Sequence, residues 1–379
     1  MTRHASTPFL IVCMATASFL AAPASTATDP GPFTVHEWGT FTSIAGPDGD
    51  AVEWLPQAGP SDLPCFVQRS PFSVKGSLSG TVRMETPVLY FYATRATTVD
   101  VSVRFRDGLI TEWFPPARVT PDGFPVPVRG EGAIGWRHVQ ITPGAAEDFP
   151  TESAASHYYA ARRTNAVPVQ SGSNKEKFLF YRGVGRMALP IAATVGSDGQ
   201  VAVRNRGGQR VGDVILFKNE RGRIAYDVLR DLITVDPPVA DREPTTELEA
   251  MLEANGLYAE EARAMIDTWR DSWFEEGTRL LYIVPRPAID AVLPLTINPP
   301  PADIARVFVG RMELVTPAIV NDIRNALLAD DRATLQRYGR FLDAMGRRVI
   351  AESAPDDRER LAQLLQRSTV TAYPAAACR

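Results

Sequence analysis

The residues best suited to chemistry are glutamates and histidines in segments that also carry tryptophan. His36 and Glu37 precede Trp38 in the segment FTVHEWGTFT, Glu85 lies in RMETP, and Glu112 lies in TEWFP. Carboxylates buried beside aromatic groups can act as general acids, and paired carboxylates flanked by indoles are typical of glycoside cleavage. We therefore predict Glu37, Glu85 and Glu112 as catalytic residues.

Strand periodicity decides which neighbours these groups have. The segment 33–42 reads as a strand, so alternate side chains point to opposite faces and His36 is separated from Glu37. Glu37 then shares a face with apolar side chains, and Glu112 does so beside Ile110 and Phe114. Pro87 makes the strand 81–92 an edge strand or breaks it near Glu85. The two faces of 33–42 carry Phe33, Val35, Glu37, Gly39 and Phe41, and Thr34, His36, Trp38, Thr40 and Thr42.

A structural reading of the same carboxylates remains open. A buried carboxylate must be paired, hydrogen-bonded or protonated, because an isolated buried charge is too costly to keep. Each glutamate can therefore belong to an ion pair with a structural arginine, for which Arg83, Arg104, Arg137 and Arg182 are the candidates.

The histidines suggest a metal site as a second possibility. Imidazole suits Zn and Cu, so His36 and His157 with a carboxylate are candidate ligands of a divalent metal, and His138 is a third candidate. Their separations match no spacing such as HExxH, and a lone histidine is commonly a hydrogen-bonded structural residue.

The strands and helices expected around these residues indicate an α+β fold. Short strands with turns at hairpin spacing predict an antiparallel, sandwich-like β body over 28–243. A helical hairpin over 247–274 and returning strands follow within 244–315, and 316–379 holds a C-terminal helical bundle and tail. In the helix 259–274 one stripe is apolar. It consists of Ala262, Met265, Ile266, Trp269 and Trp273.

The first residues predict export. Residues 1–27 read as a signal peptide, with a charged start, an apolar run and small residues before the cleavage site. The mature chain is expected to be secreted or periplasmic and not to span a membrane. Cys65 and Cys378 then remain; they can pair in an oxidising compartment or stay as two free thiols. A net charge of -4 and a pI near 5.7 argue against a nucleic-acid partner.

Several segments together resemble a known group of sequences. HEWGTFT, METPVLYFY, TEWFP, KFLFYRGVG and TWRDSWFEEGTRLLYIVPR resemble a family of secreted bacterial proteins of unassigned activity. The likeness spans most of the mature chain and implies a shared structure without an activity. In that family the position of Cys65 favours lysine, which implies that a disulfide there is not required.

Two classes of function follow. The first is an envelope or periplasmic hydrolase with a His/Glu polar site, assisted by a metal or not. The alternative is a non-catalytic module that binds an unknown ligand or envelope component, with tryptophans forming part of a ligand face. In the competing view those tryptophans are core residues. They are Trp38, Trp54, Trp113, Trp136, Trp269 and Trp273.

Overall fold

The computed structural model describes residues 33–57, 63–70, 78–121, 130–206, 208–230 and 237–369. The predicted signal peptide, residues 1–27, and Cys378 lie outside these ranges. Cys65 is disulfide-bonded, and its partner also lies outside them. None of the helices in the described ranges has the length and apolar character needed to cross a membrane.

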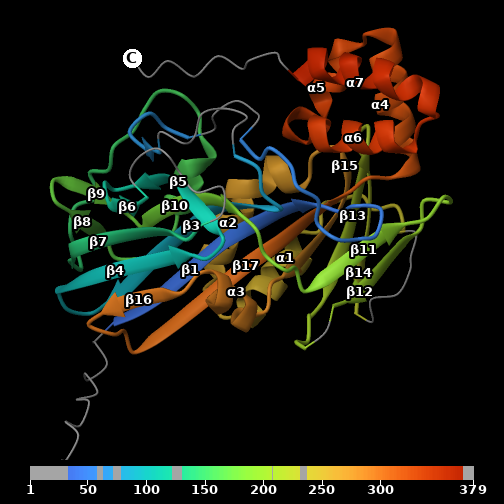
Figure 1. Ribbon diagram of the computed structural model, residues 1–379. Coiled ribbons are helices and arrows are strands. Elements are labelled where there is room, and N and C mark those ends of the chain that lie inside the picture. Colours follow the sequence, from blue (N-terminus) through green and yellow to red (C-terminus); the bar gives the residue numbers. More distant parts are fainter. Residues whose placement is uncertain are drawn as a thin grey trace, which may run out of the picture.

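A mixed sheet of nine strands forms the centre of the molecule (Figure 1). Most neighbours are antiparallel, but β1 runs parallel to β17, one of the strands that follow residue 243. The sheet contains strands from both sides of residue 243. In order they are β14 (Arg223–Leu229), β13 (Val214–Glu220), β15 (Gly277–Ile283), β17 (Asp303–Leu314), β1 (Phe33–Ile44), β3 (Val82–Ala93), β10 (Leu179–Gly185), β5 (Gly108–Phe114) and β2 (Gln68–Arg69).

A smaller sheet packs against one face of the large one. Inward side chains of both sheets form a shared apolar core, which is the sandwich predicted from strand periodicity. A hairpin of β11 (Ile191–Val195) and β12 (Val201–Asn205) adds to this core. The smaller sheet consists of β16 (Leu295–Asn298), β4 (Thr97–Phe105), β7 (Gly132–Ile141), β8 (Val169–Ser171) and β9 (Asn174–Glu176), with β6 (Arg118–Thr120) paired to β7.

Helices cover the opposite face of the large sheet and one end of the molecule. α1 (Thr245–Ala254), α2 (Ala259–Trp273) and the 3₁₀ turn η1 (His157–Arg162) pack on the sheet around a second core. α3 (Arg286–Val292) precedes β16. The C-terminal helices, red in Figure 1, form a third core with Trp54. They are α4 (Pro317–Ala329), α5 (Arg332–Arg337), η2 (Gly339–Phe341), α6 (Leu342–Glu352) and α7 (Pro355–Thr369).

The α+β class and the C-terminal helical region are therefore confirmed. The apolar stripe predicted for α2 is buried at all five positions. The strand periodicity of 33–42 also holds, because Val35 and Phe41 enter the core between the sheets and Trp38 enters the core beneath α2.

Pro87 lies in an interior strand. The expectation of an edge strand is wrong, because β3 pairs with a strand on each side. The expectation of a local break near Glu85 is confirmed. The register shifts beside Pro87 against both β1 and β10, and Thr86 has a φ of 47°. Since a bulge leaves a residue unpaired, the proline needs no ladder donor there.

The expected face of Glu112 is partly wrong. Glu112 shares its face with Phe114 but not with Ile110, since the register against β10 shifts between them. A bulge in β7 likewise changes one side chain: it gives His138 a φ of 54° and leaves it exposed while Trp136 is buried. The turn η1 is capped by Ser156.

Candidate functional site

Strand β1 divides its polar residues between two layers. Glu37 points into the core between the sheets, whereas His36, Thr40 and Thr42 face α2. α2 lies along this face of the strand, since its residue Glu261 contacts His36 and its residue Ser272 contacts Arg311, the neighbour of Thr42 in β17. Glu37 and His36 therefore belong to different sites.

Glu37 is held by an arginine from β17. Arg306 Nε lies 2.5 Å from Glu37 Oε2, and the Tyr181 hydroxyl donates to Oε1 at 2.5 Å. The side chains of Glu37 and Arg306 are 0% and 1% exposed. Arg306 also reaches Asp290 Oδ1 at 2.7 Å, which connects the pair to the surface. This geometry makes Glu37 a cross-strand ion-pair partner.

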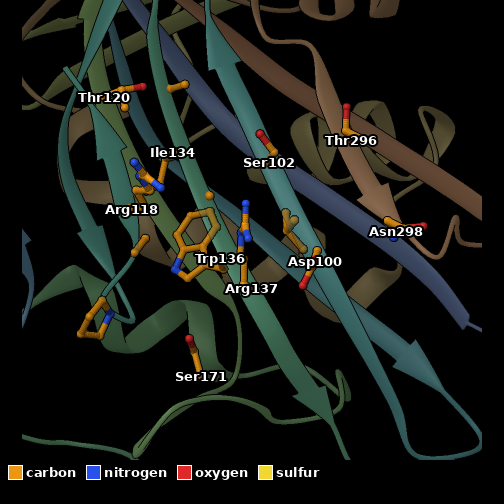
Figure 2. A pocket seen from close by; sticks show the side chains of 15 residues that line it. Asp100, Ser102, Arg118, Thr120, Ile134, Trp136, Arg137, Ser171, Thr296 and Asn298 are labelled. Atoms are coloured by element: carbon orange, nitrogen blue, oxygen red, sulfur yellow. The ribbon is translucent and has the colours of Figure 1, made fainter. Parts of the chain in front are cut away.

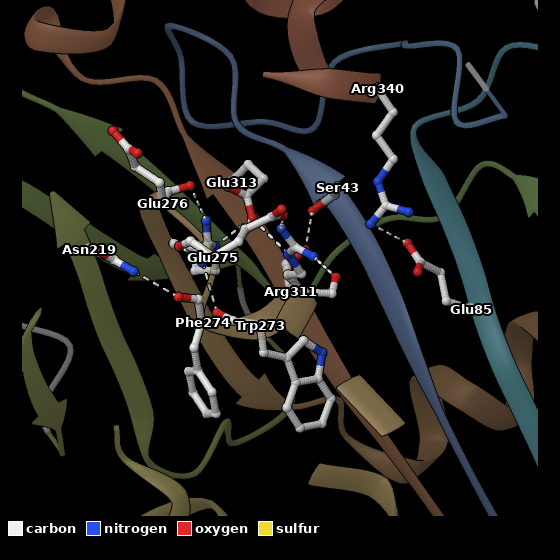
Figure 3. Close-up of polar contacts among 12 residues, drawn as sticks. Ser43, Glu85, Asn219, Trp273, Phe274, Glu275, Glu276, Arg311, Glu313 and Arg340 are labelled. Carbon is white, nitrogen blue, oxygen red and sulfur yellow. Dashed lines mark hydrogen bonds and ion pairs between the residues drawn. The ribbon is translucent and has the colours of Figure 1, made fainter. Parts of the chain in front are cut away.

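Glu85 points to the opposite face of the sheet and meets the C-terminal helices. Arg340 of η2 lies 2.9 Å from Glu85 Oε1, close enough for an ion pair but not aligned as a hydrogen bond (Figure 3). Burial alone would raise the pKa of Glu85. Arg340, Arg83 and two further arginines outweigh it and hold that pKa below its usual value.

A second arginine cluster lies beside Glu85 on the same face. Glu313 Oε1 accepts hydrogen bonds from Arg279 Nε at 2.8 Å and Arg311 Nε at 2.7 Å. Arg311 also pairs with Glu275 at 2.5 Å, as Figure 3 shows. Glu313, Arg279 and Arg311 are almost completely buried, so the three groups form one dry network at the end of α2.

Glu112 lies at the rim of the same face. It is 9% exposed, accepts a hydrogen bond from Thr111 Oγ1, and stands opposite Arg182 of β10 and Arg69 of β2 in the strand register. The structure thus places Glu85 and Glu112 on one face and Glu37 on the other. That any of the three is catalytic stays a prediction.

His36 has a different environment. Its Nδ1 lies 2.7 Å from Oε2 of Glu261, which is wholly buried. The imidazole packs against the tilted rings of Tyr258 and Tyr92, with ring centroids 4.4 and 5.2 Å away. Burial and then the charge of Glu261 raise the pKa of Tyr92. In the described part of the chain nothing hydrogen-bonds to Nε2, the second ring nitrogen.

The two histidines predicted as metal ligands lie apart. His36 contacts Glu261, and His157 lies 4.0 Å from Asp271, ten positions further along α2. Ten residues of helix span about 15 Å. Among the described ranges, no group of three or more His, Cys, Asp or Glu side chains is arranged to hold a metal ion.

A hollow lies apart from these residues, on the outer face of the smaller sheet (Figure 2). It is an open groove of about 870 Å³. A row of residues in register crosses its floor from strand to strand, at about 5 Å per strand. The row is Thr296 of β16, Ser102 of β4, Gly135 of β7 and Arg118 of β6. Asp100, Arg137 and Asn298 also line the groove.

Gly135 leaves the middle of this floor without a side chain. A Cβ at this position would meet only the Val101 carbonyl oxygen at 3.6 Å, an ordinary contact, and no left-handed φ requires glycine. Packing therefore does not explain the residue. A glycine inside a strand costs about 0.5–1 kcal/mol relative to alanine and often marks a place where a ligand approaches closely.

Sequence reasoning did not find this groove. Its residues are exposed polar side chains of ordinary alternating strands, and only the register brings them into one row. The available signal was Gly135 inside a strongly alternating strand. Five of the six tryptophans expected to form part of a ligand face are buried core residues, and one of these five, Trp136, also lines the groove. Those five are Trp38, Trp54, Trp136, Trp269 and Trp273.

Comparison with known proteins adds no relative, since neither a protein-family model nor a curated protein sequence matches the chain.

Proposed function

We propose that this protein is a secreted or periplasmic binding module whose groove on the smaller sheet takes a polar, extended ligand. The observation that carries the proposal is Gly135, a glycine that packing does not need at the centre of a groove lined with hydrogen-bonding groups.

The groove suits such a ligand in size and chemistry. Its volume of about 870 Å³ falls in the range of protein ligand sites, roughly 300–1,000 Å³. Ser102, Thr296 and Asn298 offer hydroxyl and amide groups that can donate and accept. Because these groups stand on paired strands, their positions are fixed before the ligand arrives, and preorganisation lowers the cost of binding.

Replacing Gly135 with leucine is expected to abolish binding, because the new side chain points outward and fills the groove floor. The measurement compares the wild type and Gly135→Leu on glycan and peptide arrays. At least one class of compound should bind the wild type and be lost in the variant. Identical profiles, or a wild type that binds nothing, would contradict the proposal.

Gly135→Ala is the matched control. The position accepts a Cβ, so the free energy of unfolding of this variant should equal that of the wild type or exceed it by up to about 1 kcal/mol. A cooperative unfolding curve for both variants would show that any loss of binding comes from the groove and not from misfolding.

A hydrolase is the second candidate, and the His36–Glu261 pair is the observation that favours it. A carboxylate that accepts from Nδ1 fixes the tautomer and leaves Nε2 free to take a proton from water. The Tyr92 hydroxyl and Glu261 Oε1 lie buried nearby, and neither has an aligned hydrogen bond to a described residue. Both could bind a substrate group.

If the pair is catalytic, His36→Gln should lower the rate of hydrolysis about 10²- to 10⁴-fold. A panel of glycosides and esters provides the assay. His157→Gln is the control, because His157 is partly exposed and has only a 4.0 Å contact with Asp271. An equal rate in both variants and the wild type would exclude His36 as the acid–base group.

A further inference from the structure

We propose that the ligand of the groove is an acidic saccharide, a chain of hydroxyl-rich units that carries separate carboxylate groups, recognised by Arg118 and Arg137. This inference rests on the proposed function, because it names the class of ligand for the same groove.

Arg118 and Arg137 are both exposed. Within the described residues neither Arg118 nor Arg137 makes a hydrogen bond or an ion pair, although both line the groove. Other arginines in the described ranges do pair with carboxylates, as Arg306, Arg311 and Arg340 do at 2.5, 2.5 and 2.9 Å. Two guanidinium groups in one groove, neither paired with a described residue, can bind anions, for which their planar fork is suited.

Their placement matches two acidic groups on one ligand. Arg118 pairs with Gly135, and Arg137 follows two positions along β7. Such diagonal neighbours lie roughly 7–8 Å apart. Strand alternation from Gly135 puts Arg137 on the outer face, and the bulge in β7 leaves His138 exposed beside it. In Figure 2 the two arginines lie on either side of Trp136.

Asp100 is the one carboxylate among the described residues that line the groove, and it is already engaged. Asp100 Oδ1 accepts a hydrogen bond from the His138 backbone N–H at 2.7 Å, so it stabilises the bulge. Counting the side chains that line the groove, Arg118 and Arg137 give two positive charges and Asp100 gives one negative charge. The groove therefore favours an anion. Its excess of one positive charge fits a ligand with separate acidic groups better than a dense polyanion.

The lining also favours a saccharide over a peptide. Peptides bind through an unpaired strand edge or through apolar anchors in pockets. The groove floor instead crosses paired strands and presents Ser102, Thr296 and Asn298. Hydroxyl and amide groups spread over several strands match a ligand with a hydroxyl on most of its carbons.

The test uses oligogalacturonate and alginate oligomers, each beside its methyl ester, which has the same chain without the charges. Isothermal titration calorimetry should show that the wild type binds at least one acid form roughly tenfold more tightly than its ester. Added salt should reduce this difference. Arg118→Gln and Arg137→Gln should each bring the acid form close to the ester.

Arg106→Gln is the matched control, since Arg106 is exposed and lies outside the groove; it should leave both affinities unchanged. Equal binding of acid and ester by the wild type would overturn the acidic preference but leave the groove as a saccharide site. Another outcome is that the wild type binds none of these saccharides but binds a peptide, and that Gly135→Leu abolishes this binding. This result would overturn the saccharide as the ligand and would keep the proposed function. Failure of every class of compound would overturn both.

Discussion

Replacing Arg306 with methionine is expected to lower the free energy of unfolding by about 3–5 kcal/mol. Arg306 is the only charge within ion-pair distance of Glu37 among the described residues, and both side chains lie in the core between the sheets. The variant leaves a carboxylate buried with only the Tyr181 hydroxyl as a donor. Denaturant unfolding of the two proteins measures the difference.

The double variant Glu37→Leu with Arg306→Met distinguishes the cost of leaving one charge unpaired from the loss of the packing contacts of Arg306. Removing both charges leaves no uncompensated group, so most of the lost stability should return. A double variant as unstable as Arg306→Met would mean that the arginine acts through packing. A single variant within 1 kcal/mol of the wild type would show that the ion pair contributes little.

Replacing Glu313 with glutamine should have an effect of similar size at neutral pH. Glu313 receives hydrogen bonds from both Arg279 and Arg311, and the variant leaves these two buried cations close together without their shared anion. The expected loss is about 3–5 kcal/mol of unfolding free energy. Glu276→Gln serves as the control, because Glu276 is half-exposed and pairs only at 3.3 Å with an exposed arginine.

The same glutamate should govern stability in acid. Burial would raise the pKa of Glu313, but Arg279 and Arg311 outweigh it and lower that pKa, as the arginines around Glu85 do. The stabilisation is thus complete at pH values above the pKa of glutamate in the unfolded chain, about 4.3. It is lost as the pH falls through the lower pKa values of these glutamates in the folded protein. Glu176 acts in the opposite sense, because burial raises its pKa.

Unfolding curves at several pH values test this sign. The wild type should lose stability as pH falls below about 4.3, and Glu313→Gln should lose less over the same interval. Parallel curves for the two proteins would show that Glu313 does not carry the acid sensitivity.

Local patterns predicted the elements well because they depend on neighbours in the chain. The alternation in 33–42 predicted which residues lie on each face of β1, and the apolar stripe that ends in Trp273 predicted which side of α2 is buried. The same reasoning placed Glu37 among apolar side chains. The burial of Glu37 follows from period alone, without any knowledge of the fold.

The partners of these residues could not be predicted from the sequence. Glu37 meets Arg306 across 269 positions and His36 meets Glu261 across 225, and Arg306 was not among the candidate arginines. The groove needs the register of four strands, which alternation in a single strand does not fix. Bulges at Pro87 and His138 then changed the face of individual side chains.

The parallel pairing of β1 with β17 constrains how the chain reaches its final state. Thr34 pairs with Asp303, 269 positions later, and β17 is the strand that joins β14, β13 and β15 to the rest of the sheet. During synthesis the sheet therefore exists only as two unjoined halves until residue 314 has emerged. Contacts this distant make folding slow and leave strand edges open to aggregation. A chain truncated before β17 should therefore fail to reach the native state, even with every residue of the groove's strands β4, β6, β7 and β16 present.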